Sequence, residues 1–257
     1  MNSIDEGRVS IIIPVYNVKH LIDETINSVF SQSYKNWELI LVDDLSTDGC
    51  YEYLKNEYSK YSQIIVIQNE FNSGAGYTRN KGLNIATGRY IAFLDSDDIW
   101  AEDKLKEQIT FMQEMNAPIS HTSYVFINEL GENRKGYSKA SECVDLVHNL
   151  KYTEIGTSTA VIDRKLVGSD FQFSRIRARQ DLMLWLELLG RGHHSFGINK
   201  PLVKYRIRDG QVSGNKIEML VKTLRLYIGL TNLPYHRRIF YFTCYAFNAV
   251  FKRVRKN

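Results

Sequence analysis

Three carboxylates crowd into the four-residue segment Asp95-Ser96-Asp97-Asp98, which follows directly after the apolar run at residues 90–94. Carboxylates this close repel one another, so the arrangement is costly unless a cation neutralises it. Hard divalent ions such as Mg²⁺ and Mn²⁺ take oxygen ligands, often one or two protein carboxylates together with the phosphates of a substrate. The alternative is that Asp97 or Asp98 caps the next helix and stabilises its positive end. A second acidic pair elsewhere in the chain favours the metal-and-phosphate interpretation.

That second pair, Asp43-Asp44, ends another apolar run at residues 37–42. A carboxylate there can accept hydrogen bonds from a base N–H or from ribose hydroxyls. We expect Asp44 to cap a helix that starts near Ser46, and Asp43 to bind a ligand. The glycine-rich loop at residues 72–76, with Arg79 close behind it, resembles a phosphate-binding loop. Its alternative is a flexible helix start with a solvated arginine.

The elements that must position these side chains alternate between strand and helix through the first hundred residues. Such alternation predicts right-handed crossovers and an open, mostly parallel sheet with helices on both faces. Ligands of these sheets bind beyond the carboxyl ends of the strands, which is where each polar set lies. The expected strands are residues 9–15, 37–42, 63–68 and 90–94, and the expected helices are residues 21–31, about 46–60, 77–86 and 102–115.

The second half of the chain is less regular. Its apolar patterns predict strands at residues 119–127, 158–162, 195–198 and 202–207, and helices at 179–189 and 217–228, with a polar stretch of no expected element up to about Lys151. Residues 239–251 are apolar on nearly every side. As a helix they would span about 20 Å, short of the roughly 30 Å hydrocarbon core of a membrane.

Charge is unevenly distributed along the 257 residues, which carry a net charge of +4. The segment 235–257 has six basic residues and no acidic one, so the other 234 residues, with 27 basic and 29 acidic groups, are net −2. A slightly acidic body argues against nucleic-acid binding, and a basic terminal segment indicates a local anionic partner.

Other features bear on the compartment. Three cysteines far apart in the sequence predict neither a disulfide framework nor a zinc site. The polar N-terminus indicates no signal peptide, and no apolar stretch reaches the length of a membrane-spanning helix. We therefore expect a cytoplasmic protein.

Six segments, taken together and in this order, resemble the family 2 glycosyltransferases of the GT-A fold. The resemblance covers roughly residues 9–213, and its last two segments are most similar to bacterial members that build teichuronic acid, capsule and O-antigen. It implies an inverting transfer of a sugar from a nucleoside diphosphate donor, expected to be a UDP-sugar, to an acceptor hydroxyl. The segments are SIIIPVYN (10–17), ELILVDDLSTDG (38–49), NSGAGYTRNKGL (72–83), RYIAFLDSDDIW (89–100), RQDLMLWLELL (179–189) and YRIR (205–208).

Carried over residue by residue, the resemblance implies that Tyr16 packs on the donor base and that Asp43 hydrogen-bonds it. Arg79 would approach the base or the diphosphate. Asp95 would hold the ribose, and Asp97 would bind Mn²⁺ or Mg²⁺ bridging the diphosphate. The remaining donor-binding residues that we expect are Pro14, Asn72, Ser96 and Arg208.

Asp181 takes the place of the family's catalytic base, which must lie on the acceptor side because inversion needs attack from the face opposite the leaving group. Two departures from the family pattern stand out. Gln180 replaces a common glutamate beside the base, and Arg208 replaces a histidine that could ligate the metal, so Arg208 could instead neutralise the diphosphate. The pair His193-His194 is expected in a loop or strand, not in a metal site.

We expect a GT-A domain over residues 1–212 and a helical extension over residues 213–257. The aromatic residues and basic flanks of that extension suit an anionic membrane surface, and the alternative is a helix packed on the catalytic domain or a second subunit. The expected acceptor is a saccharide, lipid-linked, at the inner face of the cytoplasmic membrane.

Other functions of this fold were weighed against these motifs. A sugar nucleotidyltransferase would carry a glycine-rich, arginine-containing loop after the first strand, where this chain has PVYN. A processive polysaccharide synthase would carry a Q-x-x-R-W motif and membrane-spanning helices. A non-catalytic nucleotide-sugar-binding partner would be indicated by loss of Asp97 or Asp181, and both are present.

Overall fold

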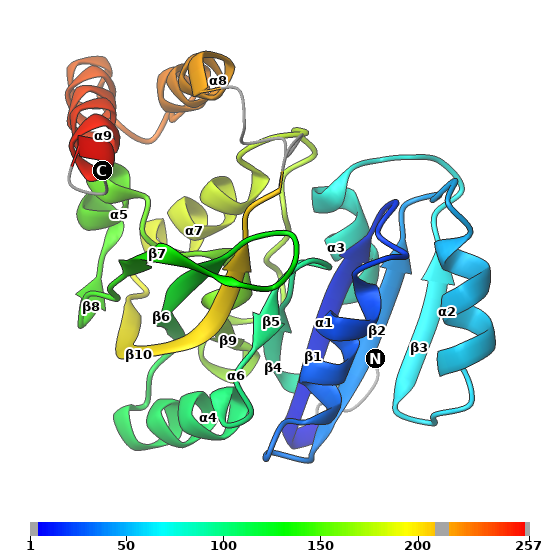
Figure 1. Cartoon of the computed structure of the whole chain (residues 1–257). Coiled ribbons are helices and arrows are strands. Elements are labelled where there is room, and N and C mark those ends of the chain that lie inside the picture. Colours follow the sequence, from blue (N-terminus) through cyan, green and yellow to red (C-terminus); the bar gives the residue numbers. More distant parts are fainter. Residues whose placement is uncertain (1–4, 209–215, 255–257) are drawn as a thin grey trace.

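The computed structural model describes residues 5–208 and 216–254 of the chain. Within these residues ten strands form one sheet, with helices on both of its faces (Figure 1). The order is β3-β2-β1-β4-β9-β6-β10-β5, with β7 paired to β6 and β8 paired to β10. The strands are β1 (Asp5–Val15), β2 (Trp37–Asp43), β3 (Ile64–Gln68), β4 (Gly88–Phe93), β5 (Ile99–Trp100), β6 (Ile119–Ile127), β7 (Asn133–Ser138), β8 (Cys143–Val144), β9 (Val161–Asp163) and β10 (Ser195–Arg206). The helices are α1 (Ile22–Phe30), α2 (Cys50–Tyr58), α3 (Ala75–Ile85), α4 (Lys104–Met115), α5 (Leu146–Tyr152), the 3₁₀ turn η1 (Thr157–Thr159), α6 (Arg164–Val167), α7 (Gln180–Gly190), α8 (Lys216–Ile228) and α9 (Tyr235–Val254).

The first four strands of the sheet order form the parallel unit that the sequence predicted. β1 pairs in parallel with β2 on one side and β4 on the other, and β2 pairs in parallel with β3. The crossovers therefore change direction at β1, which creates a crevice between the carboxyl ends of β1 and β4. The four helices α1 to α4 lie within a few residues of their predicted bounds.

Alternate residues of β1 face two separate cores, one on each side of the sheet. Ile11 and Ile13 belong to a buried cluster with residues of α1, α2 and α4. Ile12 belongs to a second cluster, with residues of α3 and α7. All three isoleucines are fully buried. This explains why the strand reads as a continuous apolar run, as expected for a strand covered on both faces.

The second half of the chain adds strands of mixed direction. β9 runs antiparallel to both β4 and β6, and β10 runs parallel to β6. Consequently β6 and β10 point the same way as β4, and the sheet as a whole stays mostly parallel. The two strands predicted at 195–198 and 202–207 are a single strand, β10, whose register shifts around Pro201.

Two further parts of this half differ from the prediction. The polar stretch up to Lys151 contains β7, β8 and α5. These elements are short, and the residues of β7 are mostly exposed, so they carry no apolar period for sequence analysis to detect. The strand predicted at residues 158–162 begins as the turn η1 and becomes β9 only at Val161.

Helices α8 and α9 lie beside α5 and α7, at the upper left of Figure 1. Side chains from all four helices form a third buried cluster. α9 is longer than the predicted apolar segment at 239–251, and its two faces differ. Phe242 and Tyr245 pack into the third cluster, whereas Phe240 and Phe247 are 56% and 62% exposed. The fully buried or nearly buried members of that cluster are Leu150, Leu182, Leu186, Leu226, Tyr227 and Tyr245.

One face of α9 thus packs on the rest of the chain, which was one of the two interpretations of this segment. None of the helices described here is long and apolar enough to span a bilayer. The predicted boundary near residues 209–214 lies outside the described residues, as do the side chains of the basic flank at 252–256.

Candidate active site

The carboxyl ends of β1, β2 and β4 bring the predicted polar residues to one edge of the sheet. Val15 is in register with Asp43 at the ends of β1 and β2, and Ile12 is in register with Phe93 in β4. Tyr16, Asp43 and Asp95 therefore follow or end three adjacent strands.

Asp43 is fully buried at the end of β2. Its Oδ2 accepts hydrogen bonds from the backbone N–H of Ser46, at 2.9 Å, and from Nε2 of Gln68, at 3.0 Å. Its Oδ1 is buried without a hydrogen-bond partner among the described residues. A buried carboxylate oxygen without a donor is costly, so this atom is suited to accept a hydrogen bond from a bound ligand.

We expected Asp44 to cap the helix after β2, and that expectation was wrong. Its Oδ1 accepts from the N–H of Ser73 and its Oδ2 from the N–H of Gly74, both at 2.8 Å, so it holds the loop that begins α3. Asn72 donates from Nδ2 to the carbonyl of Asp44 at 3.2 Å. The helix α2 begins later, at Cys50, after Gly49 in the left-handed conformation. Asn72 is therefore a brace of this loop in the structure.

The loop after β1 is tied to the loop after β2. Asn17 has a φ of 50°, and its N–H donates to Oγ of Ser46 at 3.0 Å, while its Oδ1 accepts from the N–H of Thr47 at 2.8 Å. Tyr16, the preceding residue, is 47% exposed, so its ring is free to contact a ligand. Pro14 lies within β1, in register with Val42, and is partly buried.

Arg79 lies on α3, and its residue is only 4% exposed. Its Nη2 donates to Oδ1 of Asp95 at 2.5 Å, and its guanidinium stacks over the ring of Phe173, 5.1 Å from the centroid. Nε and Nη1 are buried without a hydrogen-bond partner among the described residues. Arg79 and Asp95, which were predicted separately as donor-binding residues, are thus in contact with each other, and the arginine keeps two donors for an anionic or carbonyl group.

The turn after β4 is fixed by hydrogen bonds to buried groups. Asp98 accepts from Oγ of Ser158 at 2.6 Å and from the N–H of Arg206 at 2.9 Å. Burial, together with the nearby charges of Asp95 and Asp97, raises the pKa of Asp98 well above its ordinary value. Asp98 is consequently a structural member of the acidic turn, not an exposed ligand.

Arg206, at the end of β10, is fully buried and joins this turn to two other elements. Its Nε donates to the carbonyl of Asp97 at 2.8 Å, and its Nη2 pairs with Glu24 of α1 at 2.5 Å. Its Nη1 donates to the carbonyl of Glu129 at 2.7 Å, in the turn after β6. The sequence analysis quoted this arginine within YRIR but assigned it no role. The only signal in the sequence was a charged residue near the end of the strand predicted at residues 202–207.

Asp97 and Arg208 form an ion pair, with 2.8 Å between Oδ2 and Nε. Ser96 lies between the two acidic positions, and its carbonyl accepts from Oγ1 of Thr25 at 3.1 Å. No group of three His, Cys, Asp or Glu side chains in residues 5–208 and 216–254 gathers into a closed metal site. The carboxylate of Asp97 fits a hard divalent ion only if a ligand's phosphates complete the coordination, as is usual for Mg²⁺.

The start of α7 lies against the start of α3. A Cβ at Gly76 would come within 2.7 Å of the carbonyl of Ser174 and 3.0 Å of Cγ of Gln180, so only glycine allows this approach. Asn80 of α3 exchanges two hydrogen bonds with the backbone of Phe173, both at 2.8 Å. Asp181, the second residue of α7, is partly exposed there, and its Oδ1 accepts from the N–H of Leu182. The predicted base therefore lies beside the loop that precedes Arg79.

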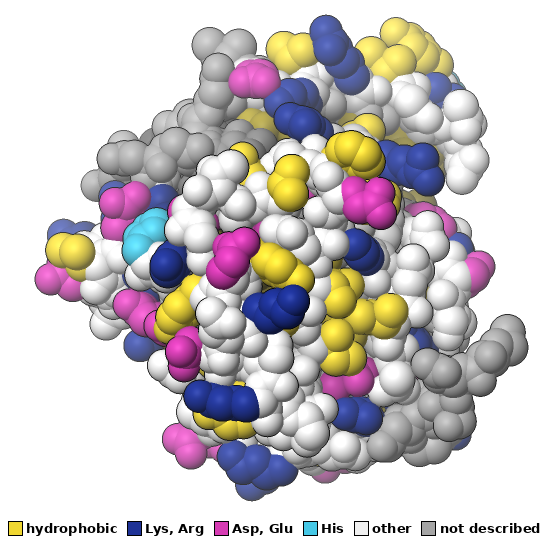
Figure 2. All heavy atoms as spheres, turned by 90° about the vertical axis from the view of Figure 1, so that its right-hand side faces the viewer, with side chains coloured by type: hydrophobic (Ala, Val, Ile, Leu, Met, Phe, Trp, Pro, Cys, Tyr) yellow, Lys and Arg dark blue, Asp and Glu magenta, His cyan; other side chains and the backbone are white. Residues whose placement is uncertain are grey.

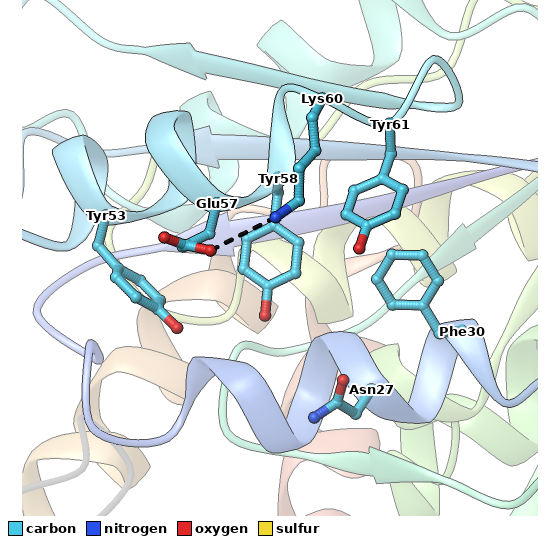
Figure 3. A pocket seen from close by; sticks show the side chains of 7 residues that line it. All are labelled: Asn27, Phe30, Tyr53, Glu57, Tyr58, Lys60 and Tyr61. Atoms are coloured by element: carbon cyan, nitrogen blue, oxygen red, sulfur yellow. Dashed lines mark ion pairs between the residues drawn. The ribbon is translucent and has the colours of Figure 1, made fainter.

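A hollow of about 400 Å³ between α1 and α2 is not part of this edge (Figure 3). Phe30 and Tyr58 end their helices, and a helix that follows a parallel strand runs back toward the opposite edge of the sheet. The hydroxyls of Tyr53 and Tyr58 both donate to Asp23 at 2.7 Å, which with burial raises the pKa of Tyr53 to about 12. We attribute this hollow to the packing of two helices.

The surface on the β3 and α2 side shows basic and acidic side chains interspersed (Figure 2). No single-sign basic patch covers that face, as nucleic-acid binding would require. The pair His193-His194 lies in the turn between α7 and β10, the loop position that the sequence predicted.

Comparison with known proteins gives the following similarities. The family model described as Glycosyl transferase family 2 matches residues 10–202. The Bacillus subtilis protein named as a teichuronic acid biosynthesis glycosyltransferase, TuaG, is 42% identical over 247 residues, covering 96% of this chain and 97% of that protein. The Escherichia coli UDP-Glc:alpha-D-GlcNAc-diphosphoundecaprenol beta-1,3-glucosyltransferase WfaP is 36% identical over 244 residues, covering 95% and 94%.

Among solved structures, S. aureus TarS 1–349 in complex with UDP-GlcNAc has a TM-score of 0.68 to this chain. The two are 20% identical, and the similarity covers 93% of this chain and 71% of that one. At this identity the likeness concerns the fold, and it confirms the predicted α/β architecture of the GT-A type.

Proposed function

This chain belongs to glycosyl transferase family 2, and from that premise we propose that it transfers a sugar from a UDP-sugar to a lipid-linked saccharide during synthesis of a bacterial surface polysaccharide. The names of TuaG and WfaP support the polymer class, the donor and the lipid-linked acceptor. The fold shared with a UDP-GlcNAc complex supports a uridine nucleotide as the leaving group.

One observation in this molecule carries the proposal: buried donors and acceptors without partners face the same strand edge. Asp43 has a buried acceptor atom without a partner, and Arg79 has two such donor atoms. A uracil ring presents an N–H to a carboxylate and carbonyl oxygens to a guanidinium, and Tyr16 is exposed beside them for ring stacking. A uracil base thus carries a group of the right kind for each of these atoms.

The transfer needs a base on one side of the sugar and charge neutralisation on the other. Asp181 would accept the proton of the acceptor hydroxyl as its oxygen attacks the anomeric carbon, and the bond to the diphosphate breaks on the opposite face, which inverts the configuration. Arg79 and Arg208 supply positive charge near the leaving diphosphate. Mn²⁺ or Mg²⁺ held by Asp97, when bound, would add Lewis-acid stabilisation of that leaving group.

A lipid-linked acceptor places the reaction at the inner face of the cytoplasmic membrane. On the outer face of α9, Phe240 and Phe247 are both largely exposed. Arg237, the third residue of the helix, is exposed as well. Aromatic side chains beside basic ones suit the headgroup region of an anionic leaflet. We therefore propose peripheral membrane association through this face, with the inner face of α9 packed on the protein.

The test combines binding and turnover with the purified chain. UDP-Glc, UDP-GlcNAc and GDP-Man are each added with Mn²⁺, and a ligand of the folded state should raise the unfolding midpoint. The ligand that does so is then incubated with a synthetic GlcNAc-diphospho-lipid, and we expect a disaccharide product of inverted anomeric configuration by mass spectrometry and NMR. EDTA should stop the transfer, and Mn²⁺ or Mg²⁺ should restore it.

Each part of this proposal can fail separately. Stabilisation by a GDP-sugar alone would contradict the uridine donor. Transfer only to a soluble saccharide would contradict the lipid-linked acceptor, and full transfer in EDTA would contradict the metal role of Asp97.

A further inference from the structure

Arg179 has an unusual backbone for a residue that begins a helix. It occupies the N-cap of α7 with φ 67° and ψ 16°, in the left-handed region. That region is unfavourable for a residue with a Cβ, and such residues persist only where surrounding contacts fix them. The carbonyl of Arg179 accepts from the N–H of Met183 at 3.1 Å, so the first turn of α7 starts from this strained residue.

The side chain of Arg179 reaches away from the strand edge, to the two C-terminal helices. Its Nε donates to Oγ1 of Thr223 in α8 at 2.9 Å, and its Nη2 donates to Oη of Tyr245 in α9 at 2.5 Å. Its guanidinium also lies 5.6 Å from the centroid of the Tyr245 ring. Thr223 is fully buried and Tyr245 is 8% exposed, so neither partner is mobile surface.

Tyr245 belongs to the third cluster, which also contains Leu182 and Leu186 of α7. Thr223 is itself fixed, because its Oγ1 donates to the carbonyl of Met219 at 2.7 Å. α7 is therefore attached to α8 and α9 in two ways: by apolar packing of Leu182 and Leu186 and by the hydrogen bonds of Arg179 at its first turn.

We propose that Arg179 is a positioning residue that fixes the first turn of α7, and with it Asp181, by anchoring that turn to α8 and α9. The C-terminal helices are on this view a part of the acceptor side of the site and not a detachable membrane anchor. The inference rests on the proposed role of Asp181 as the base. A carboxylate must be held to a fraction of an ångström for proton transfer, so loosening its turn lowers the rate and leaves donor binding intact.

The chain offers a matched pair of substitutions to test this. Tyr245→Phe removes the hydroxyl that Arg179 contacts and keeps the ring. Tyr227→Phe removes a hydroxyl from the same cluster, and the ring centroids of Tyr227 and Tyr245 are 6.0 Å apart. The hydroxyl of Tyr227, however, donates to the carbonyl of Leu150 and not to Arg179's contacts. Arg179→Lys keeps the charge and loses the fork that serves two acceptors at once.

In steady-state transfer assays we expect kcat to fall about 10-fold to 100-fold in Tyr245→Phe and in Arg179→Lys, with the donor KM unchanged. We expect the double variant to be no slower than the slower single variant, since both remove the same link. Tyr227→Phe should lower the unfolding midpoint about as much as Tyr245→Phe does, but it should keep the wild-type kcat. Equal kcat in Tyr245→Phe and Tyr227→Phe would overturn the proposal.

Hydrogen exchange tests the same link without turnover. Amides of the first turn of α7, residues 182–184, should exchange faster in Tyr245→Phe than in Tyr227→Phe. If wild type transfers no sugar, the proposed function fails while this comparison still decides whether Arg179 fixes the turn. Equal exchange in the two variants would refute the anchoring.

Discussion

The proposed donor edge and the proposed acceptor side of this molecule are built in different ways. On the donor edge, Asp43, Arg79 and Asp95 come from consecutive strand–helix units, and the parallel strand order alone brings them together. On the acceptor side, Asp181 begins a helix whose first turn is held by α8 and α9, from the end of the described chain. One side is positioned by regular secondary structure and the other by long-range contacts between side chains.

The difference suggests that donor binding and sugar transfer can be separated by mutation. Donor-side atoms lie on a sheet with fully buried strands, so they should hold their places when the acceptor side is disturbed. Acceptor-side geometry depends on a few polar contacts, which single substitutions can remove. The following predictions probe this separation, from the largest effect to the smallest.

Asp181→Asn should lower kcat by about 10²-fold to 10⁴-fold, because an amide cannot take the proton of the acceptor hydroxyl. The affinity for the nucleotide should stay near that of wild type, since the proposed contacts to the base come from Asp43 and Arg79, which lie on β2 and α3. Isothermal titration with UDP and a transfer assay on the same preparation measure the two quantities.

The contrasting variant is Asp43→Asn, on the other side. Here we expect donor affinity to fall about tenfold to a hundredfold, because the buried acceptor atom is replaced in part by a donor. If Asp181→Asn weakens UDP binding as much as Asp43→Asn does, the two sides are not separable and the base assignment is wrong.

Arg206→Met tests the contact between the two halves of the chain, where β10 meets α1 and the turn after β4; we call this contact the seam. The substitution removes the contacts to Glu24, to the acidic turn and to the turn after β6. We expect a loss of about 3 kcal/mol in the free energy of unfolding, the lower end for breaking a buried pair, because Glu24 remains half exposed to water. Urea unfolding followed by circular dichroism measures the loss.

The control for this variant is Glu24→Gln, which keeps an oxygen acceptor toward Arg206. Its cost should be about 1 kcal/mol or less, as for an exposed pair. A smaller loss in Arg206→Met than in Glu24→Gln would mean that the buried arginine does not hold the seam.

The double variant Phe240→Ser/Phe247→Ser sharpens the comparison at the tail. It removes apolar area only from the outer face of α9, so partition onto vesicles containing phosphatidylglycerol should fall about tenfold or more. The fold and the rate of donor hydrolysis in solution should not change. Met115→Ser is the control, because Met115 is 55% exposed and ends α4, which lies at the bottom of Figure 1, away from α9. Equal vesicle binding by wild type and the double variant would contradict membrane contact through this face.

The fold of the first half was predictable because its signals are local. Continuous apolar runs such as residues 37–42 gave strands buried on both faces, and turn residues after them gave the ligand edge. The assignment to family 2 was likewise predictable, since six motifs occur in the family's order. The sequence did not predict the contact between Arg79 and Asp95, which the structure shows.

Other features were missed or mistaken for a physical reason. Asp44 looked like the cap of the helix that follows it, but its oxygens bind the backbone of residues 73 and 74, about 30 positions away. β7 and α5 carry little apolar periodicity, because β7 lies at the margin of the sheet and is exposed. A capping pattern or a hydrophobic period says nothing about contacts between distant segments.

The sequence by itself determined the order of strands and helices in the first half, the edge at which Asp43, Asp95 and Asp97 gather, and the family. These follow from hydrophobic periods and from the geometry of parallel sheets, which act over a few residues. The tertiary structure alone decided which arginine meets which carboxylate, that Asp98 is buried beneath the turn, and that the first turn of α7 is tied to Tyr245, 66 residues beyond Arg179. Such pairs depend on how whole elements pack, and no local pattern of residues encodes them.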